Sequence, residues 1–384
     1  MEVNETLPSP TAEATLFEMH PILTSLIVLF VMLMILITLV GNSLVCLAVF
    51  HVRKLKQQPA NFLLVSLAFA DLGVALFVMP PALILLFEGR WILGSTVCRL
   101  WTSADLTLCT ASILNLCMIS VDRYLAVCKP LIYTAERTTK RILCYIAIVW
   151  IGALFVSIVP FTMLARSAED TCQVPQNGLY QIYATLISFY GPAIIMVTLY
   201  VRMWHVARRI CKHDRHTQCA GTESSLAKAD HDPKKSTKKM HRPSAFLAVV
   251  KVQLLSAHST FKGENKARKT LGVIMSVFIC CWLPFFVLAL LKSLIRFAIP
   301  QWLDYLALWL GYSNSMLNPL IYCKYNREFR IPFREMLCCR FSTLQTVMRH
   351  ESFTSKFGPT RQQTPLMRDR NLTSPQKLTQ TSQM

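Results

Sequence analysis

The stretch that decides the fold is Cys98–Tyr124, which reads CRLWTSADLTLCTASILNLCMISVDRY. Residues 104–121 are apolar or small apart from one carboxylate, Asp105, and the charged triplet Asp122–Tyr124 follows. Asp105 and Arg123, the middle residue of that triplet, are eighteen positions apart. In a helix this separation is about five turns and about 27 Å, close to the ~30 Å of a bilayer core. The pattern predicts a membrane-spanning helix with Asp105 near one side, Arg123 near the other, and both roughly on one face.

Asp105 is the first functional candidate. An ionisable side chain inside a membrane span is energetically costly, so its presence indicates a function or a specific partner. We therefore expect Asp105 to meet a charged ligand at one membrane face, while Arg123 meets a partner at the other. The alternative is that Asp105 pairs with a neighbouring helix and has only a structural role.

The composition of the whole chain agrees with a membrane protein. Of its 384 residues 53% are hydrophobic, and the mean hydropathy of +0.40 is high for a soluble domain of this length. Seven apolar runs are each long enough to span a bilayer, and spans must be helical because lipid offers the backbone no hydrogen-bond partners. The first run is too long, and its flank too little basic, for a cleavable signal peptide. The predicted fold is an all-α bundle whose spans cover about 22–50, 60–86, 97–128, 142–165, 179–205, 270–295 and 302–323.

Loop charges orient this bundle. The chain has 40 Lys and Arg against 21 Asp and Glu, and the excess lies in alternate loops, in the segment 206–269 and in the tail after Tyr322. A soluble nucleic-acid-binding protein would not confine its basic residues to loops between apolar runs. Because basic loops stay on the cytoplasmic side, we expect an extracellular amino terminus, a cytoplasmic tail and a plasma-membrane location.

The outer parts of this topology carry two covalent predictions. Cys98 and Cys172 are the only cysteines that it places outside, where the oxidising environment favours a disulfide. This bond would pin the second outer loop to the third helix. The outer tail, residues 1–21, contains the sequon Asn4-Glu5-Thr6, so Asn4 is a glycosylation candidate, although sequons also occur by chance.

The inner parts are mostly polar. Residues 211–262 read as a disordered basic connector between helix ends. Residues 326–340 read as a short amphipathic eighth helix at the membrane interface, followed by a disordered tail over 341–384. Cys338 and Cys339 end that helix and form a candidate palmitoylation pair; the alternative is two unmodified cysteines. The receptor domain itself is predicted over 22–325.

Polar and aromatic motifs recur within the spans, and each taken alone reads as a kink or an interhelical hydrogen bond. They are Asn42 in GNSLV, Asp71 in LAFADL, Trp150, Pro192 in FYGP, Trp282 in CCWLPFF, and Asn318-Pro319 in NSMLNPLIY. In this order, over about 22–340, the chain resembles the rhodopsin-like (class A) G-protein-coupled receptors. The resemblance implies a heterotrimeric G protein as partner, with arrestin and receptor kinases as further partners, and no enzymatic activity.

A second set of motifs looks like the biogenic amine receptors: DLTLCTASILNLC, SVDRY, CCWLPFF, and Tyr312 beside NSMLNPLIY. A protonated amine is recognised by a desolvated carboxylate and surrounding aromatic rings. The resemblance implies Asp105 as the counter-ion of the amine and Tyr312 as its hydrogen-bond partner. The remaining ligand contacts that it implies are the aromatic wall Trp282, Phe285 and Phe286, then Cys109 and Thr110 one turn inward, and Thr185 and Ser188 for a ring hydroxyl or indole nitrogen.

The identity of the amine stays open at this level. Ala184 and Ala289 weaken a catechol assignment, and Thr185 is typical of serotonin receptors. By contrast, SFYGP and KTLGVIMSVFICCWLPFF look like dopamine and octopamine receptors that raise cyclic AMP. We therefore expect a dopamine-, octopamine- or serotonin-like agonist that raises cyclic AMP; the alternative is a serotonin or tyramine receptor coupled to another G protein. Phe286 disfavours acetylcholine, and Tyr312 stands where opsins need a lysine.

The resemblance also implies the parts that transmit the signal in a bistable bundle. An allosteric sodium ion would bind at Asp71, Ser112, Asn314, Ser315 and Asn318. The central packing switch would be Ile113, Pro192 and Phe278. The inner switch would comprise Asp122, Arg123 locked by Glu264, Tyr124, the active-state tyrosines Tyr200 and Tyr322, and the motif residues Asn318 and Pro319.

Other classes fit the sequence less well. An amine transporter would show internal repeats or interrupted helices, and neither is evident. An enzyme would need a nucleophile with a base or paired carboxylates, whereas Asp71 and Asp105 lie on different helices at different depths. A peptide receptor would not need Asp105 within an aromatic cage. No cysteine pair has zinc-binding spacing, and no cofactor beyond the sodium ion is expected.

Overall fold

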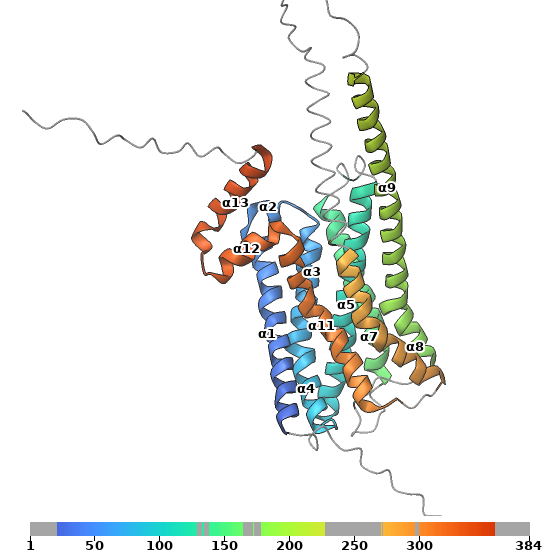
Figure 1. Cartoon of the computed structure of the whole chain (residues 1–384). Helices are drawn as coiled ribbons and strands as arrows, with labels where there is room; N and C mark the ends of the chain where they lie inside the picture. The colour runs from blue at the N-terminus through green and yellow to red at the C-terminus, as the bar shows by residue number, and fades with distance from the viewer. Residues whose placement is uncertain are drawn as a thin grey trace, which may run out of the picture.

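The computed structural model describes residues 21–128, 133, 138–163, 172, 178–226, 270, 272–295 and 299–357, which form helices and short connections with no strand among them. Seven long rods lie side by side as a bundle (Figure 1). In chain order they are α1 (Pro21–His51); α3 (Asn61–Gly73), η2 (Val74–Val78) and α4 (Met79–Glu88); α5 (Gly94–Cys128); α7 (Thr139–Met163); α8 (Gly178–Thr185), η4 (Leu186–Tyr190) and α9 (Gly191–Leu226); the Gly272–Ile295 helix, which ends in η5 (Leu291–Ile295); and α11 (Gln301–Tyr325).

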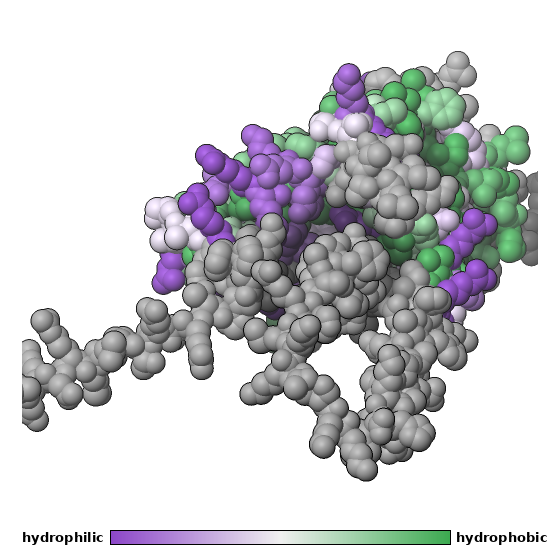
Figure 2. Space-filling model, turned by 90° about the horizontal axis from the view of Figure 1, so that it is seen from above, coloured by the Kyte–Doolittle hydropathy of each residue, from purple (hydrophilic) through white to green (hydrophobic). Residues whose placement is uncertain are grey.

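Six of these rods are long and apolar enough to cross a membrane. The exception, α11, has 25 residues but buries several polar side chains and carries charges near both ends. Large apolar side chains such as Leu29, Ile151 and Ile194 point outward from the flanks of the bundle. Figure 2 looks along the bundle and shows hydrophilic side chains on its end and hydrophobic ones on its flank. The predicted seven-helix membrane fold is confirmed.

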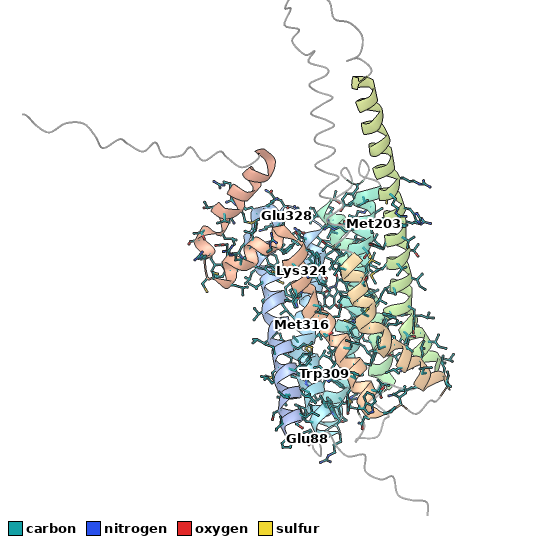
Figure 3. All side chains as sticks on the ribbon, in the orientation of Figure 1. Glu88, Met203, Trp309, Met316, Lys324 and Glu328 are labelled. Carbon is teal, nitrogen blue, oxygen red and sulfur yellow. A yellow bond between two sulfur atoms is a disulfide. The ribbon has the colours of Figure 1, made fainter. Side chains whose placement is uncertain are left out.

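The two ends of the bundle are distinguished by what lies there. The disulfide end holds the bond between Cys98 and Cys172, whose Cα atoms are 5.7 Å apart, which confirms the predicted pairing. The opposite, α12 end holds the short helices α2 (Arg53–Lys56), α12 (Arg327–Leu337) and α13 (Phe341–Phe357). Labelled side chains of α11 run from Trp309 near the disulfide end to Lys324 near the α12 end (Figure 3).

Buried polar side chains join the rods, as the motif residues suggested. Asn42 of α1 donates from Nδ2 to the backbone oxygen of Ser315 in α11, at 3.1 Å. Trp150 of α7 donates from Nε1 to Oγ of Ser66 in α3, also at 3.1 Å. α5 packs against α3, α7 and α9, so this helix occupies the middle of the bundle and carries its functional residues between the two ends.

Two rods contain a π-helical turn just before proline. Proline lacks the amide hydrogen and its ring collides with the carbonyl four residues earlier; for Pro192 that carbonyl belongs to Ser188 in η4, and for Pro80 to Leu76 in η2. The wider turn relieves this collision. Gly191 is also needed there, because a Cβ would lie 2.8 Å from the backbone oxygen of Leu186. π turns are frequent at functional sites.

The α12 end confirms the short amphipathic helix. Asn326 caps α12 by accepting a hydrogen bond from the backbone nitrogen of Glu328 at 3.1 Å. Phe329 and Phe333 are buried, and the Phe329 ring lies 6.0 Å from that of Tyr322 in α11. Lys54 Nζ and Glu328 Oε1 are 2.9 Å apart, which ties α2 to α12. Cys338 and Cys339 follow directly and are exposed.

Two polar segments expected to be disordered contain helix. Residues 341–384 were expected to form a disordered tail, but α13 occupies Phe341–Phe357 with Leu344 and Met348 buried. These two residues are four apart and share one helical face, a signal masked by the Ser, Thr and Gln around them. In the segment 211–262, α9 continues to Leu226 because no proline interrupts it before Pro233. Residues 1–20, which include Asn4, and residues 227–269, which include Glu264, lie outside the described structure.

Candidate ligand-binding site

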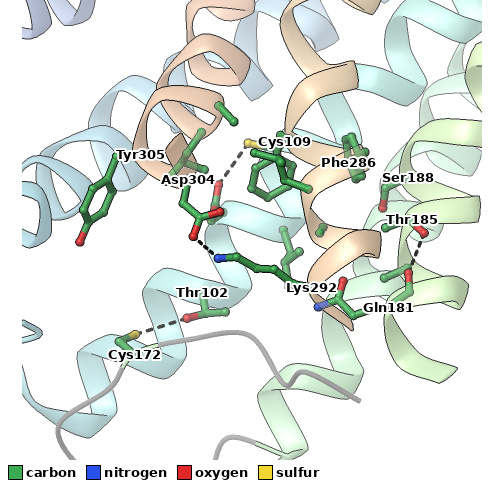
Figure 4. Close-up of a pocket in the computed structure, with 18 of the residues that line it drawn as sticks. Thr102, Cys109, Cys172, Gln181, Thr185, Ser188, Phe286, Lys292, Asp304 and Tyr305 are labelled. Atoms are coloured by element: carbon green, nitrogen blue, oxygen red, sulfur yellow. Dashed lines mark hydrogen bonds and ion pairs between the residues drawn. The ribbon is translucent and has the colours of Figure 1, made fainter. Parts of the chain in front are cut away.

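A cavity of about 310 Å³ opens at the disulfide end, between α5, α8, the Gly272–Ile295 helix and α11. This volume is at the lower end of the roughly 300–1,000 Å³ typical of small-molecule sites. Figure 4 shows polar side chains from these helices converging on it. A small ligand rather than a protein segment therefore fits the space.

Asp105 of α5 lines the cavity and is partly buried. Its Oδ1 accepts a hydrogen bond from Sγ of Cys109, one turn along the helix, at 3.2 Å. Among the described residues no ion pair involves Asp105. A thiol is a weak donor and leaves the charge of a carboxylate uncompensated. The cavity therefore offers a desolvated negative charge to a cationic ligand.

Tyr312 lies beside Asp105, as the resemblance implied, but behind the residues that line the cavity. This side chain is fully buried in α11 and does not line the cavity. Its hydroxyl lies close enough to the Asp105 carboxylate to interact with it electrostatically and as a hydrogen-bonding neighbour, although the contact does not have the geometry of a well-formed hydrogen bond. Its ring packs at right angles against Trp309, with centroids 5.5 Å apart. Tyr312 is therefore placed behind the cavity lining, where it can hold the Asp105 carboxylate in position.

The aromatic wall is assembled as the sequence suggested. Trp282, Phe285 and Phe286 line the cavity, with centroid distances of 5.9 Å for Trp282–Phe285 and 5.3 Å for Phe285–Phe286. Phe189 of η4 stacks on Phe286 at 4.6 Å, a contact that no sequence motif indicated. Gly311 admits the Trp282 indole, since a Cβ there would lie 2.7 Å from the ring. These rings can surround a cation or pack on an aromatic ligand.

Hydroxyl groups occupy the side of the cavity formed by α8 and η4. Thr110 Oγ1 and Ser188 Oγ are 3.1 Å apart and form a hydrogen bond in which either hydroxyl can be the donor. Thr185 Oγ1 donates to the backbone oxygen of Gln181 at 2.7 Å, so its lone pairs stay available to accept a ligand N–H or O–H. Thr110, Gln181, Thr185 and Ser188 all line the cavity. The cavity thus has a cation-binding subsite at Asp105 and a hydrogen-bonding subsite at these four residues.

Several cavity residues were missed from sequence. Gln181 stands four residues before Thr185 and seven before Ser188, so helical spacing alone could have placed it on the same face. Lys292 of η5 and Asp304 of α11 form an ion pair at the cavity. No motif pointed to that pair, because its members come from different helices.

Beneath the cavity lies the expected packing switch. Ile113 and Phe278 are fully buried in the same apolar core, and Ile113 also forms part of the cavity floor. The Phe278 ring is 5.6 Å from that of Phe189. Pro192 is buried at the start of α9. A ligand against the aromatic wall is thus connected through packed rings to the middle of the bundle.

Deeper still, Asp71 is fully buried and accepts three hydrogen bonds. Oγ of Ser112 and Oγ of Ser315 each donate to Oδ1 at 2.8 Å, and Nδ2 of Asn318 donates to Oδ2 at 2.9 Å. Asn314 is buried as well, and its Nδ2 has no hydrogen-bond partner among the described residues. Four of the five residues expected to bind sodium therefore form one connected cluster.

At the α12 end, Asp122 Oδ1 accepts a 2.6 Å hydrogen bond from the hydroxyl of Tyr133, and Asp122 Oδ2 lies 3.9 Å from Nε of Arg123. Tyr124 packs on the core and Tyr322 is buried. Two further switch residues, Tyr200 and Pro319, lie against glycines. A Cβ on Gly272 would lie 2.7 Å from the Tyr200 hydroxyl, and one on Gly41 would lie 2.6 Å from Pro319.

The sequence is similar to known receptors. A model of the family described as "7 transmembrane receptor (rhodopsin family)" matches residues 41–322. The chain is 41% identical to the 5-hydroxytryptamine receptor 1 of Drosophila melanogaster, over 80% of this chain and 63% of that protein, so the match spans less than two thirds of that relative. It is 37% identical to the 5-hydroxytryptamine receptor 7 of Xenopus laevis, over 80% of this chain and 76% of that protein. It is also 37% identical to the human 5-hydroxytryptamine receptor 1B, over 81% of this chain and 86% of that protein.

Proposed function

Because this chain belongs to the rhodopsin family of seven-transmembrane receptors, we propose that it is a G-protein-coupled receptor for a biogenic amine and that its preferred agonist is serotonin. The family is one of receptors and not of enzymes. The observation that carries the amine assignment is Asp105, a carboxylate without an ion-pair partner in the described structure, placed in a cavity walled by aromatic rings.

Three observations favour serotonin over the other amines. The similar proteins are named as receptors for 5-hydroxytryptamine. Thr185 keeps acceptor capacity for an indole N–H or a ring hydroxyl. Ala184 replaces the first of the hydroxyls that a catechol would use, which weakens the dopamine alternative. In this proposal the ammonium pairs with Asp105, and the indole ring lies against Phe285 and Phe286.

We place the disulfide end outside the cell and the α12 end in the cytoplasm of a plasma-membrane protein. An oxidising exterior favours the Cys98–Cys172 bond, and basic loops favour the opposite side. Asn4 would then be open to glycosylation. Cys338 and Cys339, exposed at the end of α12, would be open to palmitoylation, which would anchor this helix to the bilayer.

Signalling would follow from a shift between two bundle conformations. An agonist can favour the active state only by its greater affinity for it, and the rings Phe286, Phe189 and Phe278 provide the contact path. At the α12 end the active state would bind a heterotrimeric G protein near Arg123, and afterwards arrestin and receptor kinases. The fifth- and sixth-helix motifs support a G protein that raises cyclic AMP.

We also propose that the Asp71 cluster holds an allosteric sodium ion. The donor set fits a small hard cation, because a buried carboxylate and the hydroxyl oxygens of Ser112 and Ser315 are oxygen ligands. When bound, the ion would compensate the buried charge of Asp71. The side chains of Asn314 and Asn318 would close the site from α11.

The test is a ligand panel in transfected cells. Cyclic AMP and calcium would be measured against serotonin, dopamine, octopamine, tyramine and histamine, with surface expression quantified. We expect serotonin to act at the lowest concentration and to raise cyclic AMP. A fall in cyclic AMP, or a calcium response alone, would show that the receptor couples to a different G protein from the one proposed. If another amine is more potent, that amine and not serotonin is the preferred agonist. No response to any amine would overturn the proposal.

A further inference from the structure

The cavity contains a second carboxylate, and this one is already neutralised. Lys292 of η5 donates a hydrogen bond from Nζ to Oδ2 of Asp304 in α11, and the two side chains form an ion pair. Figure 4 shows Lys292 reaching across the cavity to Asp304. Both side chains line the cavity and are about one-third exposed, at 33% for Lys292 and 29% for Asp304. The pair is therefore open both to solvent and to an incoming ligand.

The two cavity carboxylates differ in their partners. Among the described lining residues the charged side chains are Arg90, Asp105, Lys292 and Asp304. Asp304 has a lysine, whereas Asp105 has the neutral Cys109 thiol and Tyr312 hydroxyl beside it and no ion pair within the described structure. A ligand with one ammonium group is therefore directed to Asp105. Among the described lining residues, a second ammonium group would find a counter-ion only by displacing Lys292.

The local structure holds Lys292 in this position. It lies within the π turn η5, and this turn packs against α8: a Cβ on Gly178 would lie 3.7 Å from Leu294. Asp304 lies in the first turn of α11, and the next residue, Tyr305, accepts a 3.0 Å hydrogen bond from Nε2 of Gln301. The cation and the anion thus project from two packed helix ends and not from long loops.

We propose that the Lys292–Asp304 pair is a charge filter, which makes the cavity select ligands that carry a single positive charge. Asp304 could bind a second cationic group, but the side chain of Lys292 already fills that position. This inference rests on the proposed function of the receptor, because it takes a monoamine bound at Asp105 as its starting point. The competing explanation is that the pair only ties the Gly272–Ile295 helix to α11 and does not sense the charge of a ligand.

The probes are serotonin derivatives that differ only in a terminal charge. N-(3-aminopropyl)serotonin and N-butylserotonin have the same chain length, and the first ends in an ammonium group where the second ends in a methyl group. N-(5-aminopentyl)serotonin and N-hexylserotonin form a longer pair, so that the result does not depend on whether one chain is too short to bring its terminal group to Asp304. Each would compete with a radiolabelled antagonist on membranes from cells that express the full chain, together with serotonin as reference.

The variants are Lys292→Met, which keeps an unbranched apolar side chain without the charge, and the double variant Lys292→Met with Asp304→Asn. In the wild type the methyl-ended probe of each pair should bind better. In Lys292→Met the affinity ratio should shift toward the ammonium-ended probe by up to about fivefold, since a partly exposed ion pair contributes up to about 1 kcal/mol. The double variant should return the ratio toward that of the wild type. Raised ionic strength should shrink the shift, a dependence that a purely structural tie would not produce.

Two results separate the filter from the proposed function. If Lys292→Met binds serotonin but leaves the probe ratio unchanged at both chain lengths, the filter is wrong and the receptor assignment stands. If the wild type binds no amine, both are wrong. Should Lys292→Met fail to reach the surface, Asp304→Asn gives the opposite prediction: an unpaired Lys292 should weaken the ammonium-ended probes more than the methyl-ended ones, and an unchanged ratio would again overturn the filter.

Discussion

Replacing Asp105 by asparagine keeps the size of the side chain and removes its charge. The carboxylate is partly buried, accepts a hydrogen bond from the Cys109 thiol and has the Tyr312 hydroxyl beside it, and neither neighbour is charged. Loss of one partner of a shielded charge pair costs roughly 2–5 kcal/mol. Since 1.4 kcal/mol is about tenfold in affinity, serotonin should bind about thirty- to several-thousand-fold more weakly. Folding should survive, because the amide oxygen can still accept from Cys109.

The assay is radioligand competition and agonist potency at matched surface expression. Asp304→Asn is the matched control, because it removes a carboxylate from the same cavity that already has a lysine partner. For serotonin this control should lose about fivefold or less, as expected for a partly exposed ion pair. Normal serotonin potency in Asp105→Asn would refute the reasoning and make Asp105 a structural residue.

Three further experiments test the proposed lock on Arg123, the packing of Trp282 and the sodium site. Glu264→Ala should raise basal signalling if Glu264 restrains Arg123, as the sequence resemblance implies, and unchanged basal activity would remove the lock. Gly311→Ala should lower the unfolding temperature of the purified receptor, because the new Cβ would lie 2.7 Å from the rigid Trp282 ring and overpacking costs typically 1–3 kcal/mol. Sodium chloride, compared with N-methylglucamine chloride, should change agonist affinity in the wild type but not in Asp71→Asn, because removing the carboxylate removes the charge that holds the ion; equal sodium sensitivity would contradict the proposed ion site.

Gly152→Ala is the matched control for the glycine variant. Its Cβ would meet only the end of the Leu114 side chain, at 3.3 Å, and a leucine can turn aside where an indole against a helix cannot. A loss in Gly152→Ala as large as that in Gly311→Ala would mean that the close approach of Trp282 is not the cause.

The sequence predicted those parts of the site that lie on one helix or follow from topology. Asp105 follows from residue spacing along α5, and the Cys98–Cys172 pairing follows from membrane sidedness. Cys109, Thr110 and the Phe pair on the Gly272–Ile295 helix are implied by the family resemblance of their motifs.

The remaining parts depend on distances between helices. Tyr312 lies behind the cavity wall because the rotation of α11 is set by close packing, with Trp282 against Gly311. The pairing of Lys292 with Asp304 requires the ends of two helices to converge, which residue spacing does not reveal. Helix α13 was missed because its buried face is narrow and its composition is that of a disordered tail.

The π turn η4 sets the residue count of the fifth rod. It holds one residue more than an α-helical turn would, within about the same full rotation. Deleting one residue within Leu186–Tyr190 would therefore restore a regular helix and leave α8 facing nearly the same way relative to α9. Thr185 and Gln181 would stay toward the cavity, and the face of α9 toward α5 would keep its contacts. The turn is thus the place on this rod where the chain can change in length by one residue without rotating the ligand-binding half against the signalling half.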